Sequence, residues 1–231
     1  MADSTHYSPI AKAGFTAPAL YDKYRPSYPT QAIHRLLSSL SITDCEVCIL
    51  ELGAGTGKWT EDPAAWSPKF RIIALEPHRQ MRDFLAQKRL RNVTVMDGLA
   101  QHIPLPDESV DCVLAAQTRF ASVQSLSEIC RVLKPRGGLG LIWNVEDYNS
   151  PRSFQVQTKW EEQLREIIWA LDDGQPRFKS EMWQSAFDSS VAKQLFRLPL
   201  NLETWRLSQM VDETGARKPH IFLLYAAKRA A

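Results

Sequence analysis

The sequence has few cysteines, and their spacing excludes the common zinc and disulfide architectures. Four of its 231 residues are cysteine, and Cys45 and Cys48 form a CxxC pair with no second pair or histidine nearby at zinc-finger spacing. We therefore predict no metal site. We interpret the cysteines as structural thiols, namely Cys45, Cys48, Cys112 and Cys130. A redox role for the CxxC pair is the less favoured alternative, because the pair precedes an expected strand and not the start of a helix.

Long hydrophobic runs are absent as well. The apolar stretch at residues 221–227, IFLLYAA, is far shorter than the roughly 20 residues that span a bilayer. The first 15 residues lack the apolar core of a secretory signal. A formal net charge of +2, with acids and bases interspersed, indicates no nucleic-acid-binding surface. We expect a soluble, cytoplasmic protein with no nucleic-acid or membrane partner, and its oligomeric state stays open.

The sequence does contain a regular alternation of strand and helix patterns. Nearly continuous apolar stretches predict buried strands at residues 46–52, 70–77, 92–98, 110–116 and 139–145. Between them, helical spacing predicts helices at about 30–40, from Gly57 onward, at 78–90 and at 125–138; Pro63 and Pro68 should shorten or kink the second. This order predicts an α/β fold with a doubly wound, mostly parallel sheet that binds ligands at the carboxyl ends of its strands.

The two ends of the chain differ from this central pattern. We expect residues 1–28 to form a loose arm and residues 29–231 to form a single domain. Within an insertion at about 149–190, a long amphipathic helix should place apolar residues on one side, namely Trp160, Leu164, Ile167, Ile168 and Leu171. Residues 195–208 and 220–228 predict a terminal antiparallel hairpin with its turn near Gly215.

A glycine-rich loop follows the first strand, in the stretch ILELGAGTGKWT at residues 49–60. A nucleoside triphosphate loop is close to excluded, because Lys58 is followed by Trp59 and not by serine or threonine. The GxGxG spacing also differs from the dinucleotide fingerprint. Glu51, two residues before the first glycine, would repel a pyrophosphate and attract an ammonium or sulfonium group. S-adenosylmethionine carries both of these positive charges and no phosphate.

Two further acids follow the next strands. Glu76 closes the second strand, where a doubly wound sheet places the carboxylate that binds ribose hydroxyls. Asp97 closes the third strand beside Gly98, where an adenine would lie. Each acid alone is commonly a helix cap, but three acids at three successive strand ends favour a cofactor site.

These motifs resemble those of a known family. LELGAGTGK, ALEP, IPLPDESVDCVLAAQ and EICRVLKPRGGLGLIWNVED are similar to successive motifs of the class I S-adenosylmethionine-dependent methyltransferases. The stretch YDKYRPSYP at residues 21–29 resembles the arm of the type 11-like branch that acts on small molecules. The similarity covers about residues 15–185. It implies a Rossmann-like sheet of seven strands and S-adenosylmethionine as cofactor, and it leaves the substrate open.

The resemblance also implies roles for individual positions. Glu51 and the amides of residues 53–57 would surround the methionine part, Glu76 would bind the ribose, residues 97–100 would line the adenine, and Tyr24 would close over the cofactor. The implied cofactor-binding residues are Tyr24, Glu51, Gly53, Ala54, Gly55, Thr56, Gly57, Glu76, Pro77, Met81, Asp97, Gly98, Leu99, Ala100 and Gln117.

The acceptor side departs from the family pattern. Relatives of this branch continue after the fourth strand into a His-Trp pair, whereas this chain has Arg119 and Phe120 in a shorter loop. The catalytic residue therefore stays unknown. Arg119 is a candidate partner for an acceptor carboxylate, and a solvent-exposed loop arginine is an equal alternative. Trp143 and Tyr148 are further candidate substrate contacts, because they follow expected strand ends.

We expect a methyltransferase that acts on a small organic acceptor, in specialised metabolism. One alternative binds the same cofactor but catalyses a cyclisation or rearrangement, and the missing His-Trp pair motivates it. A second alternative is a regulatory member without catalysis. An NAD-dependent dehydrogenase is disfavoured by the glycine spacing and by Glu51.

Overall fold

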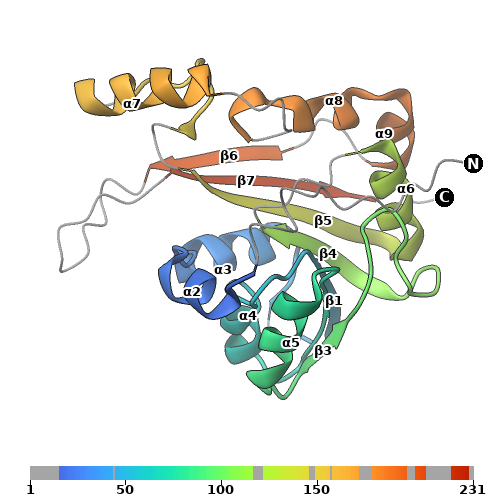
Figure 1. Cartoon of the computed structure of the whole chain (residues 1–231). Coiled ribbons are helices and arrows are strands. Elements are labelled where there is room, and N and C mark those ends of the chain that lie inside the picture. The colour runs from blue at the N-terminus through green and yellow to red at the C-terminus, as the bar shows by residue number, and fades with distance from the viewer. Residues whose placement is uncertain are drawn as a thin grey trace, which may run out of the picture.

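The centre of the protein is a seven-stranded sheet in the order β3-β2-β1-β4-β5-β7-β6 (Figure 1). The structure is a computed structural model that describes residues 16–43, 45–116, 122–145, 149–156, 158–171, 178–196, 201–206 and 220–228. The first five strands in this order are parallel, and β7 is antiparallel to both β5 and β6. The strands are β1 (Val47–Leu52), β2 (Phe70–Leu75), β3 (Val93–Met96), β4 (Val110–Ala116), β5 (Leu133–Val145), β6 (Asn201–Arg206) and β7 (His220–Ala227). The predicted fold class, with its terminal hairpin, is confirmed; the turn expected near Gly215 lies outside the described residues.

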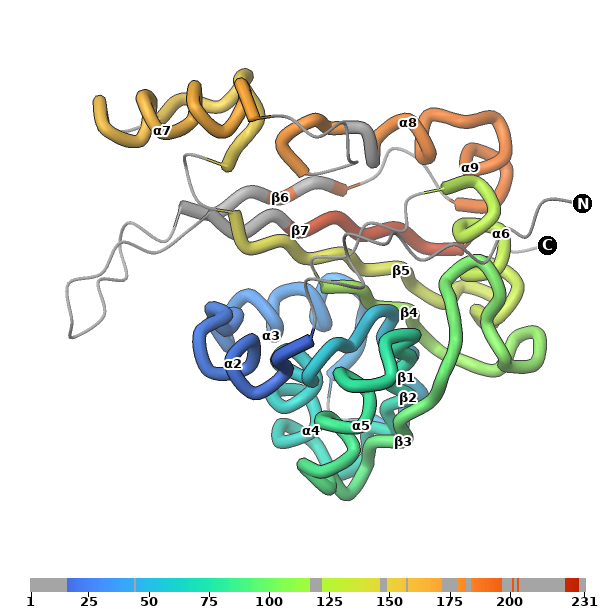
Figure 2. Tube along the Cα trace, in the orientation of Figure 1, coloured from blue at the N-terminus to red at the C-terminus, as the bar shows by residue number. Residues whose placement is uncertain are grey.

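Helices cover both faces of this sheet. They are α2 (Pro18–Tyr24), α3 (Thr30–Ser39), α4 (Glu61–Trp66), α5 (Arg79–Gln87), α6 (Val123–Val132), α7 (Lys159–Ala170), the 3-10 helix η2 (Phe178–Ser180), α8 (Met182–Asp188) and α9 (Ser190–Leu195). On one face, α6, α8 and α9 pack together (Figure 1). On the other face, α3 packs against β5 and β7. Helices α7 and α8 follow one another on the β6 side of the sheet (Figure 2).

The alternation of side chains along β1 divides the core in two. Leu50 and Leu52 join the core cluster beneath α6, α8 and α9, whereas Ile49 joins the cluster beneath α3, as the two-residue period of a strand requires. Glu51 therefore faces the same side as Ile49. This register places its carboxyl group on the face that α3 and the arm cover.

Two predictions for the first third of the chain were wrong. The segment before residue 30 contains α2, which has a proline in its first turn and ends at Tyr24, just before Arg25 and Pro26. The helix after the glycine loop begins at Glu61 and not at Gly57. Gly57 cannot begin a helix because its φ is 86°, in the left-handed region. Helix α4 has only six residues, so it is short, as Pro63 and Pro68 predicted.

The end of α6 also differs from the prediction. The helix stops at Val132, and β5 begins at once with Leu133, so that Lys134 to Gly138 belong to the strand. Leu133 pairs with Val110 before the register shifts along β4. A Cβ at Gly137 would lie 2.9 Å from the carbonyl oxygen of Asp111. Glycine thus lets the strand pass close to its neighbour, where the sequence suggested a helix terminator.

The amphipathic helix of the insertion leaves much of its apolar side exposed. Helix α7 spans Lys159–Ala170, and its buried residue is Glu161, which accepts a hydrogen bond from the Thr158 hydroxyl. Trp160 and Ile167 are 52% and 56% exposed. The helix is instead tied to the protein by polar contacts, because the Nζ of Lys179 donates to the carbonyl of Ile168 at 2.9 Å.

Candidate functional site

Three acids end neighbouring parallel strands at one edge of the sheet. Glu51 pairs in register with Ala74 of β2, and Glu76 follows the end of that strand. The backbone N–H of Glu76 donates to the carbonyl of Met96 at 3.0 Å, and Asp97 comes next in the chain. The sequence placed these three carboxylates at successive strand ends, and the structure brings them to the same edge.

The glycine loop turns sharply at this edge. Gly53, Gly55 and Gly57 have φ values of 66°, 58° and 86°, which are costly for residues with a side chain. The N–H groups of Gly53 and Ala54 both donate to the carbonyl of Leu75, at 2.8 and 3.2 Å. A Cβ at Gly57 would collide with Leu85, whereas one at Gly55 would meet nothing within 4 Å. The loop is therefore pinned to β2 and α5, and it is open at Gly55.

Glu51 is a buried acid without a cationic partner in the described part of the chain. It is 1% exposed, and its Oε2 accepts a hydrogen bond from the Thr60 hydroxyl at 2.6 Å. Burial raises the pKa of Glu51 to about 8, the hydrogen bond from Thr60 opposes this rise, and the nearby charge of Glu76 adds to it. Such a carboxyl group favours a ligand that brings a positive charge into the site.

Glu76 fastens the glycine loop to the next helix. Its Oε2 accepts the N–H of Gly55 at 2.7 Å, and its Oε1 accepts the N–H of His78 at 2.7 Å. Burial raises the pKa of Glu76, and these hydrogen bonds from His78 and Gly55 oppose the rise. Because a carboxylate oxygen can accept two hydrogen bonds, Glu76 keeps acceptor capacity for hydroxyl groups of a ligand.

The segment after β3 forms the third part of this edge. Arg82 binds it to α5: its Nη1 lies 3.1 Å from Asp97 Oδ1 and 2.7 Å from the carbonyl oxygen of Glu76. A Cβ at Gly98 would lie 2.8 Å from Leu75, so the glycine allows the segment to pass close to β2. Leu99 then pairs with His102 in an isolated antiparallel bridge.

Four other predicted cofactor-binding residues are buried or partly buried. Met81 is buried at 2% exposure on α5, and Pro77 is half-buried at the strand end, where its carbonyl accepts from Arg82 Nη1 at 3.1 Å. Thr56 is buried at 1% exposure, and Ala100 packs partly buried against the core.

The arm lies beside the glycine loop. Lys88 Nζ contacts Asp22 Oδ1 of α2 at 2.9 Å and Glu61 Oε1 of α4 at 3.0 Å. Ser27 is contacted by Lys58, whose Nζ lies 3.4 Å from its hydroxyl oxygen, and by Asn144, whose Nδ2 donates to its carbonyl at 3.3 Å. These contacts join the arm to the loop, to α4, to α5 and to β5.

Sequence reasoning chose one arm tyrosine and missed another. Tyr24 is 71% exposed, whereas Tyr28 is 7% exposed. Burial raises the pKa of Tyr28, and the charge of Glu51 is near enough to contribute to the rise. Tyr28 belongs to the YDKYRPSYP stretch at residues 21–29, so the sequence did contain a pattern that pointed to this tyrosine. Thr60 and Lys88 had none, because their partners depend on the folded arrangement.

The predicted acceptor residues are described only in part. Trp143 on β5 is 5% exposed, and its ring centre lies 5.3 Å from that of Phe178. Gln117, Arg119 and Tyr148 lie outside the described residues. His34 stacks on Trp66 with ring centres 3.9 Å apart, so it has a packing role.

The described residues contain neither a metal-ion cluster nor a membrane-spanning helix. No group of three or more histidine, cysteine, aspartate or glutamate side chains among them is arranged to hold a metal ion, and no helix in the described ranges is long and apolar enough to cross a membrane. The four cysteines are free thiols, and burial raises the pKa of Cys48, Cys112 and Cys130.

Comparisons with known proteins support the interpretation of this edge of the sheet as a cofactor site. A family model described as a methyltransferase domain matches residues 49–137. An uncharacterised methyltransferase-like protein of Schizosaccharomyces pombe is 40% identical over 169 residues, which are 72% of this chain and 62% of that protein. Residues 49–137 thus match the methyltransferase domain family, and the chain is similar in sequence to methyltransferases.

Other methyltransferases are less similar to this chain. The malonyl-[acyl-carrier protein] O-methyltransferase of Methylococcus capsulatus is 31% identical over 136 residues, covering 51% of this chain and 50% of that protein. An S-adenosylmethionine-dependent methyltransferase structure from Aquifex aeolicus has a TM-score of 0.53 and 19% identity, covering 96% of this chain and 99% of that one. The latter likeness shows the fold. The chain thus spans about half to three fifths of the length of the Schizosaccharomyces and Methylococcus relatives.

The described residues fit the cofactor of this family, S-adenosylmethionine. Glu51 offers a buried carboxyl group that can ionise to pair with a cation, and Glu76 offers acceptors beside a loop that is open at Gly55. Trp59 is 2% exposed, and its Nε1 has no hydrogen-bond partner within the described ranges. A buried donor of this kind favours a bound polar group.

Proposed function

We propose that the protein transfers the methyl group of S-adenosylmethionine to a small organic acceptor. The buried carboxyl group of Glu51 carries this proposal, because it is 1% exposed and pairs with no cation among the described residues. A ligand with ammonium and sulfonium charges supplies the missing positive charge, and a phosphate-bearing dinucleotide would be repelled.

The proposed roles follow the order of the strand ends. Glu51 and the loop from Gly53 to Gly57 hold the methionine part, Glu76 accepts from the ribose hydroxyls, and the segment after β3 lines the adenine. The remaining members of the proposed site are Tyr24, Pro77, Met81 and Gln117. Support comes from the geometry of the first two groups, since the loop and Glu76 are joined by a 2.7 Å hydrogen bond.

Bound S-adenosylmethionine supplies a sulfonium methyl group that is open to in-line displacement. The protein then has to position the acceptor and exclude water, and such positioning supplies much of the rate of a displacement of this kind. An acceptor that is already ionised needs no base. The Methylococcus relative is named as an O-methyltransferase of malonyl-[acyl-carrier protein], and a malonyl group ends in a carboxylate. This name supports an acid as the acceptor here. A place in specialised metabolism stays a prediction.

Titration calorimetry tests the cofactor part of the proposal. We expect S-adenosylmethionine and S-adenosylhomocysteine to bind and NAD not to bind, and Glu51→Ala to weaken binding of both sulfur ligands. Glu46→Gln is a matched control, because Glu46 is exposed just before β1. Unchanged affinity in Glu51→Ala, or no binding at millimolar concentration, contradicts the proposed site.

A second experiment tests the reaction. S-adenosylmethionine labelled in its methyl group is incubated with the protein and a cell extract, and we expect label in a small organic product. Cofactor binding without any transferred label would instead favour a cyclisation, a rearrangement or a regulatory role.

A further inference from the structure

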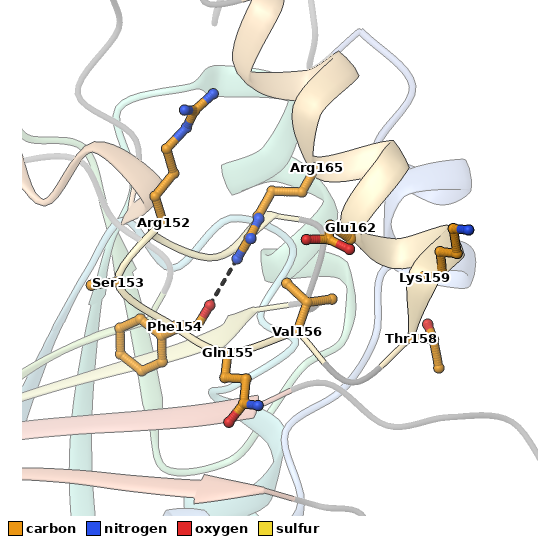
Figure 3. Close-up of a pocket in the computed structure, with 9 residues that line it drawn as sticks. All are labelled: Arg152, Ser153, Phe154, Gln155, Val156, Thr158, Lys159, Glu162 and Arg165. Atoms are coloured by element: carbon orange, nitrogen blue, oxygen red, sulfur yellow. Dashed lines mark hydrogen bonds between the residues drawn. The ribbon is translucent and has the colours of Figure 1, made fainter.

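A cavity of about 600 Å³ lies between the segment at residues 152–156 and helix α7 (Figure 3). This volume is within the range of small-molecule sites, which runs from about 300 to 1,000 Å³. Phe154 and Val156 line it with apolar surface, and Arg152, Lys159 and Arg165 line it with positive charge, against the one carboxylate of Glu162. The lining therefore suits a molecule with an apolar body and a negative group.

Arg165 is the residue best placed to meet that negative group. It extends from α7 across the cavity toward the 152–156 segment (Figure 3), and its Nη1 donates to the carbonyl of Phe154 at 2.7 Å. Its Nε is buried and has no hydrogen-bond partner in the part of the chain that the structure describes. No carboxylate of a described residue forms an ion pair with Arg165. Glu162, about one turn before Arg165 on α7, forms none with it either.

Arg152 lines the same cavity, but its guanidinium group already contacts other side chains. Its Nη2 lies 2.8 Å from Glu166 Oε2, and its guanidinium stands 5.2 Å above the ring of Trp169. Both contacts hold Arg152 on the α7 side. The contrast between the two arginines leaves Arg165 as the guanidinium whose charge no described residue balances.

The segment that lines the cavity follows a strand that ends at the same edge of the sheet as the proposed cofactor site. The segment that lines it follows the carboxyl end of β5, and Phe154 packs against the core cluster that contains Trp143 and Val145 of that strand. β1, β4 and β5 are parallel, so β5 ends at the same edge as β1 with Glu51. At the end of β5, Asn144 also contacts the arm through Ser27.

We propose that this cavity binds a carboxylate-bearing small molecule, the methyl acceptor, and that Arg165 is its anion-binding residue. The planar guanidinium group can donate two parallel hydrogen bonds to a carboxylate, and Phe154 with Val156 contacts the apolar body. The identity of the ligand as the acceptor rests on the proposed function, whereas the carboxylate site does not.

The test uses two pairs of probes that differ in charge and not in shape. Benzoate with benzamide and cinnamate with cinnamamide are titrated into the full chain, with and without S-adenosylhomocysteine, and binding is followed by saturation-transfer NMR and calorimetry. We expect the carboxylate of at least one pair to bind about tenfold or more tightly than its amide. Arg165→Gln should abolish that difference, and Arg165→Lys should keep part of it.

Arg91→Gln is the matched control, because Arg91 is exposed between α5 and β3, away from the insertion. Thermal melting of each variant establishes that it is folded. Equal binding of acid and amide, an unchanged preference in folded Arg165→Gln, or no binding of either pair at millimolar concentration overturns the carboxylate site. If the probes discriminate but S-adenosylmethionine neither binds nor transfers label, the proposed function fails and the carboxylate site stands.

Discussion

Binding of S-adenosylmethionine should depend on pH through Glu51, which must be ionised to pair with a cation. Glu51 is 1% exposed, and burial raises its pKa to about 8, so it is about nine-tenths protonated at pH 7. Removing that proton at pH 7 costs about 1.4 kcal/mol, the equivalent of one pKa unit. We therefore expect affinity to rise about tenfold between pH 7 and pH 9, and binding at pH 7 to release about 0.9 proton.

Calorimetry measures both quantities. The enthalpy of binding at pH 7 is recorded in phosphate and in Tris, whose ionisation enthalpies differ, and the difference gives the number of protons released. Glu51→Gln keeps the shape of the protonated acid but cannot ionise, so we expect weak binding at every pH and no proton release. Glu46→Gln should behave as wild type.

The same pKa shift fixes the sign of a stability change. Glu51 holds its proton more tightly in the folded protein than in the unfolded chain, where the pKa is near 4.5. Its contribution to stability is therefore full below about pH 4.5 and is lost as the pH rises through about 8. Glu51→Gln avoids this loss and should exceed wild type at pH 9, by up to the order of 5 kcal/mol in urea unfolding. Affinity independent of pH, no released proton and a constant stability difference would together refute the reasoning.

Three further predictions concern the loop, the second acid and the arm. Gly57→Ala places a methyl group against Leu85 at a φ of 86°, and urea titration should show a loss on the order of 2–3 kcal/mol; wild-type stability would mean that the loop relaxes freely. Glu76→Gln replaces one of the two oxygens that accept backbone N–H groups, and calorimetry should show about tenfold weaker cofactor binding; unchanged affinity would contradict its ribose role. Lys88→Met removes two ion pairs from a largely buried cation, and trypsin should cut the arm several-fold faster; an unchanged rate would show that other contacts hold it.

Matched controls separate these effects from general damage. Gly55→Ala has the same left-handed strain, at a φ of 58°, but no collision, so its difference from the Gly57 variant isolates the contact with Leu85. Lys193→Met removes an exposed lysine from α9, on the opposite face of the sheet from the arm. Glu46→Gln again controls for the loss of an acid.

The cofactor side of the site could be predicted from the sequence because its parts are local. A parallel strand delivers its last residue to a fixed edge, so Glu51, Glu76 and Asp97 could be placed together from strand boundaries alone. The left-handed turns of the loop follow from its glycine spacing in the same way. By contrast, Lys88 meets an aspartate 66 positions away, and no local pattern indicates such a pair.

The acceptor side could not be predicted because it depends on packing beyond the strands. The helical spacing of Trp160 and Ile167 predicted an apolar side of the helix, but it did not show what that side contacts, and these side chains are more than half exposed. Helix α7 is held by polar contacts, including Lys179 with Ile168 and Arg165 with Phe154. Periodicity measures the hydrophobicity of a face and not what lies against it, so Arg165 carried no signal in the sequence.

The arm and the charge of Glu51 should be coupled if the arm supplies part of the burial that raises the pKa of Glu51. Tyr28 is 7% exposed and lies near enough for its pKa to respond to Glu51, while Lys88 holds the preceding helix in place. If the arm keeps water from Glu51, Lys88→Met should lower the pKa of Glu51 and reduce the protons released at pH 7 below those of wild type. If the proton count stays the same while trypsin cuts the arm faster, the sheet and the glycine loop bury Glu51 by themselves.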